Sequence, residues 1–237
     1  MNQERIIVAL DVDKLETAVK LVQQLRDYVG AFKVGLELVN SAGLPVFDKI
    51  RDAGAKKIFY DAKLHDIPNT VAGAARAAVR LGVWAFNVHC SGGFAMMKAA
   101  KDAVLRDAGK LGVAPSLVLG VTLLTSIDQQ QLRDELSIPD TVNAYVERMA
   151  RMAQAAGLDG VVASPQEIKM IRSTCGKNFV VVTPGVRPAG AEQGDQKRVM
   201  TPEEAVSAGA DYIVIGRPIT QAADARTAAR DIAATLP

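Results

Sequence analysis

Residues 60–66 of the chain read YDAKLHD and crowd two carboxylates and one ammonium into a short stretch. The charged residues are Asp61, Lys63 and Asp66. In a strand, Asp61 and Lys63 would point to the same face because they are two positions apart. Opposite charges held this close each keep the other ionised. The stretch therefore predicts a paired carboxylate and ammonium on one face of a strand.

Such a pair suits the loss of carbon dioxide from a substrate. A carboxylate fixed where a substrate carboxylate must lie repels it, by roughly 4 kcal/mol at about 4 Å and an effective dielectric near 20. A lysine beside that place can stabilise a developing carbanion and then protonate it. The substrate would have to be held by contacts remote from the reacting carbon, and we expect those contacts to be with a phosphate.

Eight short apolar runs, rich in β-branched residues, recur along the chain and indicate strands. Near-continuous apolar runs, rather than strict alternation, are typical of strands covered on both faces. The runs are residues 6–11, 31–36, 57–63, 84–90, 116–124, 160–164, 179–185 and 212–217. Helical periodicity is clearest in residues 15–29, 69–82, 141–157 and about 219–235.

The alternation of these segments, with no linker between them, predicts an α/β fold of the (β/α)8 TIM-barrel type. We expect one catalytic domain over residues 1–237. An open doubly wound sheet is the main alternative on pattern alone, but eight evenly spaced units favour closure into a barrel.

Composition narrows the possible partners and compartments. The chain has 237 residues, 49% of them hydrophobic, and a net charge of only +2, without a basic block that would indicate a nucleic-acid partner. It has no apolar run long enough for a membrane span and no signal-peptide pattern, so we expect a cytoplasmic protein. Cys90 and Cys175 indicate reduced thiols rather than a disulfide framework, and no zinc site is predicted.

In a (β/α)8 barrel the active site lies at the carboxyl ends of the strands. Polar residues follow most of the predicted strands at that end. They are Asp11, Lys33, Asp61, Lys63, Asp66, His89, Thr125, Arg187 and Arg217. A lone charge in such a place is more often a solvated loop residue or a local ion pair. Their gathering at one rim favours a site, and Lys33 on the neighbouring strand could reach Asp61 and Lys63.

Two later segments predict the phosphate contacts. Residues 183–202 form a long loop rich in Gly and Pro, and such loops are usually lids or binding loops. Residues 215–220, IGRPIT, follow the eighth strand. Barrels of this type often bind phosphate at these two loops, where Arg187 and Arg217 can hold an anion. Either arginine alone would be weak support, but together they stand at the expected strands.

The sequence resembles a known family along nearly its whole length. Residues 61–70, DAKLHDIPNT, are similar to the D-x-K-x-x-D-I-P-N-T signature of the orotidine 5′-phosphate decarboxylases. Further segments resemble the bacterial branch of that family in the same order. They are LDVD, FKVGLEL, NVHCSGG, VTLLTS, PGVR, GDQKR and IGRPIT.

The resemblance implies conversion of orotidine 5′-phosphate to uridine 5′-phosphate and carbon dioxide, the last step of de novo pyrimidine synthesis. It implies no metal, flavin or other cofactor, and a homodimer with sites at the subunit interface. Lys33, Asp61, Lys63 and Asp66 match the charged catalytic tetrad. Lys63 would protonate C6 of the pyrimidine, and Asp61 would stand beside the substrate carboxylate.

The remaining substrate-binding positions are carried over in the same way. Asp11 would bind the ribose, with Lys33 and Asp66 also contacting its hydroxyls. Asp66, Ile67 and Thr70 would belong to the segment given to the partner's site. Thr125 would lie against the pyrimidine, and Gln196, in the lid, would contact the substrate near its phosphate and base. The positions around the phosphate would be Arg187, Gly216 and Arg217.

Two alternatives stay open. A sugar-phosphate aldolase or decarboxylase of the same superfamily, such as hexulose-phosphate synthase, also carries D-x-K-x-x-D, but it depends on metal and has an acidic residue near the position of Lys33. A non-catalytic phosphate-binding barrel would keep the phosphate loop and lose one of the four charges. His65 and His89 could be general bases, but we interpret His89 as a packing or hydrogen-bonding residue of the barrel mouth.

Overall fold

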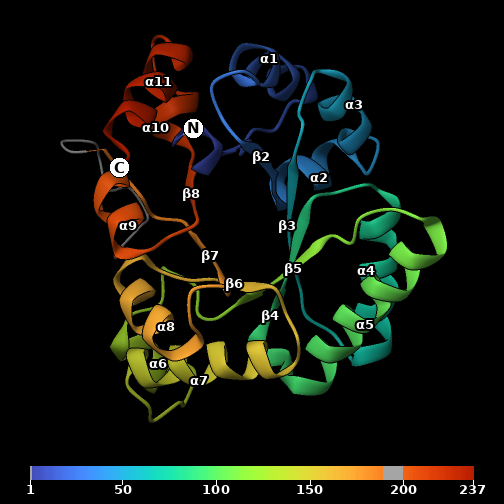
Figure 1. Ribbon diagram of the computed structural model, residues 1–237, viewed down its shortest axis with the longest axis vertical. Helices are drawn as coiled ribbons and strands as arrows, with labels where there is room; N and C mark the ends of the chain where they lie inside the picture. Colours follow the sequence, from blue (N-terminus) through green and yellow to red (C-terminus); the bar gives the residue numbers. More distant parts are fainter. Residues whose placement is uncertain (1, 189–199) are drawn as a thin grey trace.

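The computed structural model describes residues 2–188 and 200–237. Within them, eight parallel strands form a closed barrel in sequence order, and β8 pairs with β1 (Figure 1). The strands are β1 (Ile6–Ala9), β2 (Ala31–Val34), β3 (Ile58–Leu64), β4 (Ala85–His89), β5 (Leu117–Val121), β6 (Gly160–Val162), β7 (Val180–Thr183) and β8 (Tyr212–Ile215). Seven strands lie within the predicted apolar runs and β3 extends one residue beyond its run, to Leu64, so the predicted (β/α)8 barrel is confirmed.

Alternate side chains of the strands enter two separate apolar layers. On β1, Ile6 and Val8 pack in the layer between strands and helices, while Ile7 and Ala9 point into the barrel. The inner layer contains Ile7, Ala9, Ala31, Phe59, Ala85, Leu119, Val121, Val162, Val182 and Val214. Full burial of a large apolar side chain contributes about 1.5–3 kcal/mol, which explains why both faces of each strand are apolar.

The helices surround the barrel in the order of the sequence, and the last helix, α11, packs beside the first, α1 (Figure 1). They are α1 (Leu15–Leu25), α2 (Leu36–Ala42), α3 (Val46–Asp52), α4 (Pro68–Arg80), α5 (Gly93–Leu111), α6 (Gln129–Asp134), α7 (Val142–Ala155), α8 (Ile168–Cys175), α9 (Pro202–Ala208), α10 (Arg217–Thr220) and α11 (Ala225–Thr235). Three of the helices predicted from periodicity correspond to α1, α4 and α7.

The prediction of one last helix over about 219–235 is wrong. The structure has two helices, α10 and α11, with residues 221–224 between them. Asp224 begins the second one, because its carboxylate accepts hydrogen bonds from the backbone N–H groups of Arg226 and Thr227 at 3.0 and 3.3 Å. An aspartate in this capping position satisfies N–H groups that have no partner in the first helical turn.

The predicted loop at residues 183–202 lies partly outside the described residues. Its two ends are described, and they meet in a β-bridge between Val186 and Met200. The backbone N–H of Arg187 donates to the carbonyl of Met200 at 3.0 Å, and Arg187 lines the cavity described below. Across residues 2–188 and 200–237, we find no helix long and apolar enough to span a bilayer.

Candidate active site

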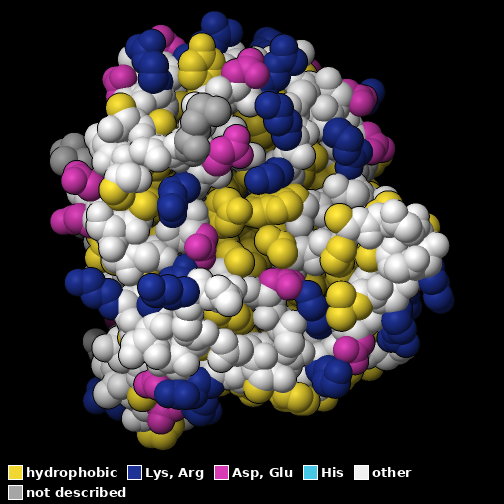
Figure 2. All heavy atoms as spheres, viewed as in Figure 1, with side chains coloured by type: hydrophobic (Ala, Val, Ile, Leu, Met, Phe, Trp, Pro, Cys, Tyr) yellow, Lys and Arg dark blue, Asp and Glu magenta, His cyan; other side chains and the backbone are white. Residues whose placement is uncertain are grey.

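A cavity of about 680 Å³ opens at the carboxyl ends of the strands. Its charged lining residues follow the inward-pointing positions: Lys33 comes two residues after Ala31, and Asp61 two residues after Phe59. Period-two alternation therefore places these charges on the barrel axis above the apolar layer. Figure 2, in the view of Figure 1, looks at the opposite end of the barrel, where the strands begin, and shows hydrophobic side chains near its centre with charged side chains around them.

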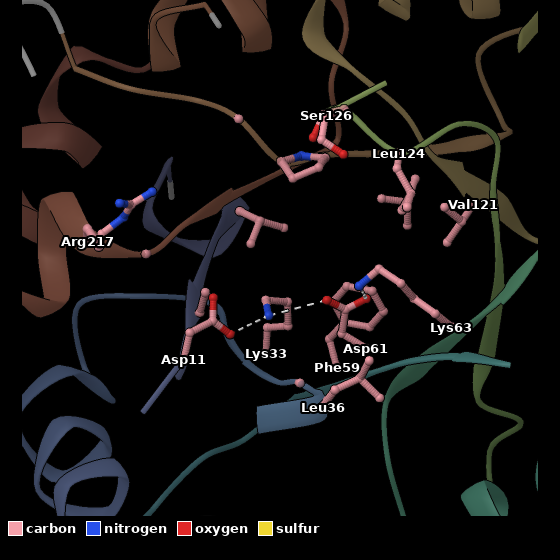
Figure 3. Close-up of a pocket in the computed structure, with 18 of the residues that line it drawn as sticks. Asp11, Lys33, Leu36, Phe59, Asp61, Lys63, Val121, Leu124, Ser126 and Arg217 are labelled. Atoms are coloured by element: carbon pink, nitrogen blue, oxygen red, sulfur yellow. Dashed lines mark hydrogen bonds and ion pairs between the residues drawn. The ribbon is translucent and has the colours of Figure 1, made fainter. Parts of the chain in front are cut away.

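Four side chains form a row of alternating charge in this cavity (Figure 3). Lys33 Nζ lies 2.8 Å from Asp11 Oδ1 and 3.3 Å from Asp61 Oδ2. Lys63 Nζ lies 2.8 Å from the other oxygen of the same carboxylate, Asp61 Oδ1. Asp61 thus bridges two ammonium groups, and each of its oxygens has a cationic partner.

The two central members of the row, Lys33 and Asp61, stay charged although their side chains are largely buried. Burial alone would lower the pKa of Lys33, but the carboxylates of Asp61 and Asp11 outweigh burial and hold it above its ordinary 10.5. Burial alone would raise the pKa of Asp61, but Lys33, Lys63 and the hydrogen bond from Asn87 bring it below its ordinary 3.8. At neutral pH the cavity therefore contains an ionised Asp61 beside a protonated Lys33.

Gly35 leaves the space that the Lys33 ammonium occupies. A Cβ atom at this position would lie 3.0 Å from Lys33 Nζ and 3.4 Å from Asp11 Oδ1. Contacts near 3.0 Å are tighter than a Cβ atom usually makes, so an alanine here would require the Lys33 ammonium to shift by a few tenths of an ångström.

Lys63 reaches Asp61 through an irregular backbone rather than through regular strand alternation. The pairing of β3 with β4 shifts register between Tyr60 and Leu64, and Lys63 has φ +49°. A non-glycine residue in this left-handed region is uncommon. Regular alternation from Asp61 to Lys63 was therefore the wrong reason to expect the two side chains together, although they do meet.

The predicted phosphate residues lie in the same cavity as the charged row. Arg187, Gly216 and Arg217 line it, together with Thr125. In Figure 3, Arg217 and Lys63 lie on opposite sides of the cavity, with Asp11, Lys33 and Asp61 between them. This separation gives the cavity two ends, one carrying the guanidinium and one carrying the ammonium.

The structure does not bring every predicted site residue into this cavity. Asp66, Ile67 and Thr70 are exposed at the start of α4, and Asp66 Oδ1 accepts a hydrogen bond from the Ile67 backbone N–H at 2.6 Å. None of the three is among the residues that line the cavity within the described part of the chain. Gln196 lies outside the described residues.

Several cavity residues had no signal in the sequence analysis. Ser126 and Gln221 line the cavity beside predicted positions, and Gly35 faces the ion pair. Asn87 hydrogen-bonds to both Asp61 and Lys63. Asn87 follows Ala85 by two residues in β4, so an alternation argument on the fourth apolar run could have placed its side chain inside the barrel.

The two histidines lie beside Lys63, at the ends of β3 and β4. The rings of His65 and His89 have centroids 5.5 Å apart and are tilted by 37°. Burial lowers the pKa of His89, and the neighbouring His65 and Lys63 lower it further against the opposing effect of Asp61. Within residues 2–188 and 200–237, no group of three or more His, Cys, Asp and Glu side chains is arranged to hold a metal ion.

A closed eight-stranded parallel barrel with a charged cavity at the carboxyl ends of its strands has the construction of a (β/α)8-barrel enzyme. Residues 4–232 match the family model described as "Orotidine 5'-phosphate decarboxylase / HUMPS family". The chain belongs to this family.

Individual relatives cover almost the whole chain. A protein of Moorella thermoacetica named orotidine 5'-phosphate decarboxylase is 54% identical over 99% of this chain and 92% of its own length. One of the same name from Syntrophomonas wolfei is 50% identical, over 99% and 98%. The crystal structure of orotidine 5'-phosphate decarboxylase from Lactobacillus acidophilus superimposes with a TM-score of 0.85 at 39% identity, covering 97% of both chains.

Proposed function

We propose that this protein converts orotidine 5′-phosphate to uridine 5′-phosphate and carbon dioxide. The observation that carries the proposal is the row Asp11–Lys33–Asp61–Lys63 along one cavity, with Asp61 between two ammonium groups. The bond between C6 and the carboxylate breaks, carbon dioxide leaves, and the electron pair remains on C6. Lys63 Nζ then gives a proton to C6, and water restores the proton to Lys63.

Asp61 and Lys63 act at the two stages of this reaction. The substrate carboxylate would lie beside ionised Asp61, where like charges oppose each other until carbon dioxide has left. The ammonium of Lys63 stabilises the negative charge that develops on C6 and is already placed to protonate it. Lys33 keeps Asp61 ionised and, with Asp11, contacts the ribose.

The phosphate would bind at the far end of the cavity from Lys63. Arg217 lies at that end (Figure 3), Arg187 and Gly216 also line the cavity, and a guanidinium can form two parallel hydrogen bonds to a phosphate. Binding energy from the phosphate fixes the pyrimidine at the charged row without acting on the reacting carbon. Thr125 would lie against the pyrimidine, and Gln196 is proposed to contact the substrate from the loop after β7.

We further propose a homodimer in which the start of α4 completes the partner's site. Asp66, Ile67 and Thr70 are exposed and do not line the cavity of their own chain. Ile67 is 67% exposed, the highest value among the exposed large hydrophobic residues in the described part of the chain, and burial against a second copy would cover it. Asp66 would then be the fourth charge of the tetrad. We also propose one catalytic domain, which the family match over residues 4–232 supports.

The test is the ultraviolet absorbance change on mixing the purified protein with orotidine 5′-phosphate in the presence of a chelator. Wild type should form uridine 5′-phosphate without added metal, and Lys63→Ala should lose about 10²–10⁴-fold in kcat, the contribution typical of a positioned general acid. A folded wild-type protein that forms no product would overturn the proposal. Activity restored only by a divalent metal with a sugar phosphate would instead support a hexulose-phosphate synthase.

A further inference from the structure

Asn87 is a polar side chain enclosed in the barrel wall. It lies in β4, between Phe86 and Val88, and is 0% exposed. A buried amide is costly unless its hydrogen-bonding groups have partners. Asn87 Oδ1 accepts from the backbone N–H of Lys63 at 2.7 Å, and its Nδ2 donates to Asp61 Oδ1 at 2.7 Å. Both partners belong to the charged row.

The amide sits where the pairing of β3 and β4 is interrupted. Tyr60 pairs with Phe86 and Leu64 pairs with Val88, so Asp61 to Lys63 on β3 face Asn87 alone on β4. The extra residues of β3 cannot all pair with backbone groups of β4. The Asn87 side chain supplies the acceptor that the Lys63 backbone N–H would otherwise lack.

The orientation of the amide follows from its partners. A backbone N–H can only donate, so the Asn87 atom facing Lys63 N must be the oxygen. The NH₂ group then faces Asp61, whose ionised carboxylate can only accept. An aspartate or a leucine of similar size at position 87 could not make both contacts at neutral pH.

The two hydrogen bonds act on the two groups that carry the proposed chemistry. Lys63 has φ +49°, one of two non-glycine residues with positive φ in the described part of the chain. Such a conformation is strained and persists where surrounding contacts hold it. Asp61 Oδ1 accepts from Asn87 and from Lys63 Nζ, while Oδ2 faces Lys33. The rotation of the carboxylate is thus fixed at both oxygens.

We infer that Asn87 is a positioning residue: it holds the Lys63 backbone in the left-handed conformation from which Nζ reaches Asp61, and it fixes the rotation of the Asp61 carboxylate. This inference rests on the proposed decarboxylation, in which Asp61 and Lys63 must keep a set geometry beside C6. Asn87 is fully buried and is not among the described residues that line the cavity, so in this proposal it acts through Asp61 and Lys63 rather than by contact with the substrate.

The experiment compares Asn87→Ala and Asn87→Asp with wild type and with Ser116→Ala. Ser116 is a matched control, because it is also buried and hydrogen-bonds to the backbone, donating to the Val83 carbonyl at 2.7 Å, but before β5 and away from the cavity. We measure kcat against pH, the Kd for uridine 5′-phosphate, and Tm. Misplacing a catalytic group by about 1 Å costs about 10²-fold in rate.

We expect both Asn87 variants to lose about 10²-fold in kcat at neutral pH, with Kd for uridine 5′-phosphate changed by less than about 10-fold. Asn87→Asp should recover activity as the pH falls, because the introduced carboxyl group, once protonated, can again donate to Asp61. Ser116→Ala should keep wild-type kcat. The inference is overturned if the Asn87 variants keep kcat, if Kd weakens as much as kcat falls, or if the Asn87→Asp profile parallels wild type.

A crystal structure of Asn87→Ala gives a readout independent of turnover. We expect Lys63 to leave the left-handed region and its Nζ to lose the 2.8 Å contact with Asp61 Oδ1. An unchanged Lys63 would overturn the inference. If wild type does not decarboxylate orotidine 5′-phosphate, the proposed function fails. The crystal structure of Asn87→Ala then tests on its own whether Asn87 holds Lys63 and Asp61 in place. If Asn87→Ala does not fold, Asn87→Asp, which keeps the side-chain volume, is used for both the kinetic measurement and the crystal structure.

Discussion

Asp159 and Asp211 come directly before β6 and β8, at the end of the barrel opposite the cavity. Lys101 Nζ lies 2.6 Å from Asp159 Oδ1, and Asp159 Oδ2 accepts from the backbone N–H of Val118 at 2.7 Å. Arg172 pairs with Asp211, whose carboxylate also accepts from the backbone N–H of Val181 at 2.7 Å. Each of these carboxylates joins a side-chain cation to the first residues of a strand.

The ion pairs at the cavity end are built differently. Asp11 and Asp61 share Lys33, Asp61 also holds Lys63, and all four line open space. At the opposite end, each carboxylate also binds a backbone N–H group near the start of a strand, and Arg172 binds backbone carbonyls as well, those of Gly209 and Phe179. Ion pairs between a carboxylate and a cation therefore stabilise the barrel at one end, whereas at the other end they face a cavity that a ligand can enter.

Matched substitutions of one aspartate at each end give the sharpest test of this difference. We expect Asp61→Asn to lower kcat by about 10³-fold, since it removes the charge opposed to the substrate carboxylate and weakens the hold on Lys63. Asp159→Asn should leave kcat within about twofold of wild type, because the residue is distant from the cavity. Steady-state decarboxylation with both variants checks this. Equal effects on kcat would contradict the division between the two ends.

Within the cavity, the comparison can be extended from the charged row to the phosphate end. Arg217→Ala should weaken phosphate binding and lower kcat/KM by about 10²-fold, because loss of one partner of a charged hydrogen bond costs about 2–5 kcal/mol. Arg226→Ala, on the exposed face of α11, is the control arginine and should have no effect. If kcat/KM of Arg217→Ala stayed near wild type, the assignment of the phosphate end would be wrong.

At the opposite end, the expected loss is of stability rather than of rate. Arg172 has a side chain only 16% exposed, and it ties α8 to backbone carbonyls and to Asp211. Arg172→Ala should lower the free energy of unfolding by about 2 kcal/mol. This is less than the roughly 3–5 kcal/mol expected for breaking a fully buried ion pair, because the Asp211 side chain is 37% exposed and solvent weakens the interaction. Denaturant unfolding measures this. A variant with lowered kcat and unchanged stability would break the comparison.

The sequence predicted most of what depends on short-range pattern. The strands were recognisable because both faces of each are buried, and Asp61 and Lys33 could be assigned because strand ends meet at one rim. Alternation could have placed the Asn87 side chain inside the barrel, but the two hydrogen-bond partners of Asn87 and the conformation of Lys63 could not be predicted in this way. They depend on the register between β3 and β4, which joins residues 24 apart in sequence. The space left by Gly35 likewise exists only once Lys33 and Asp11 are placed.

The smallest expected effect concerns His89, whose ring lies 5.5 Å from that of His65. Its pKa in the folded protein is below the ordinary 6.5, chiefly because of burial, so the unfolded chain takes up its proton first as the pH falls. The free energy of unfolding should therefore drop as the pH falls below about 6.5 through the folded pKa. His89→Asn should flatten that part of the profile in urea unfolding at several pH values. His65→Asn, which removes one of the groups that lower the pKa of His89, should reduce the drop in the free energy of unfolding without abolishing it. A wild-type profile in both variants would show that His89 does not titrate in this way.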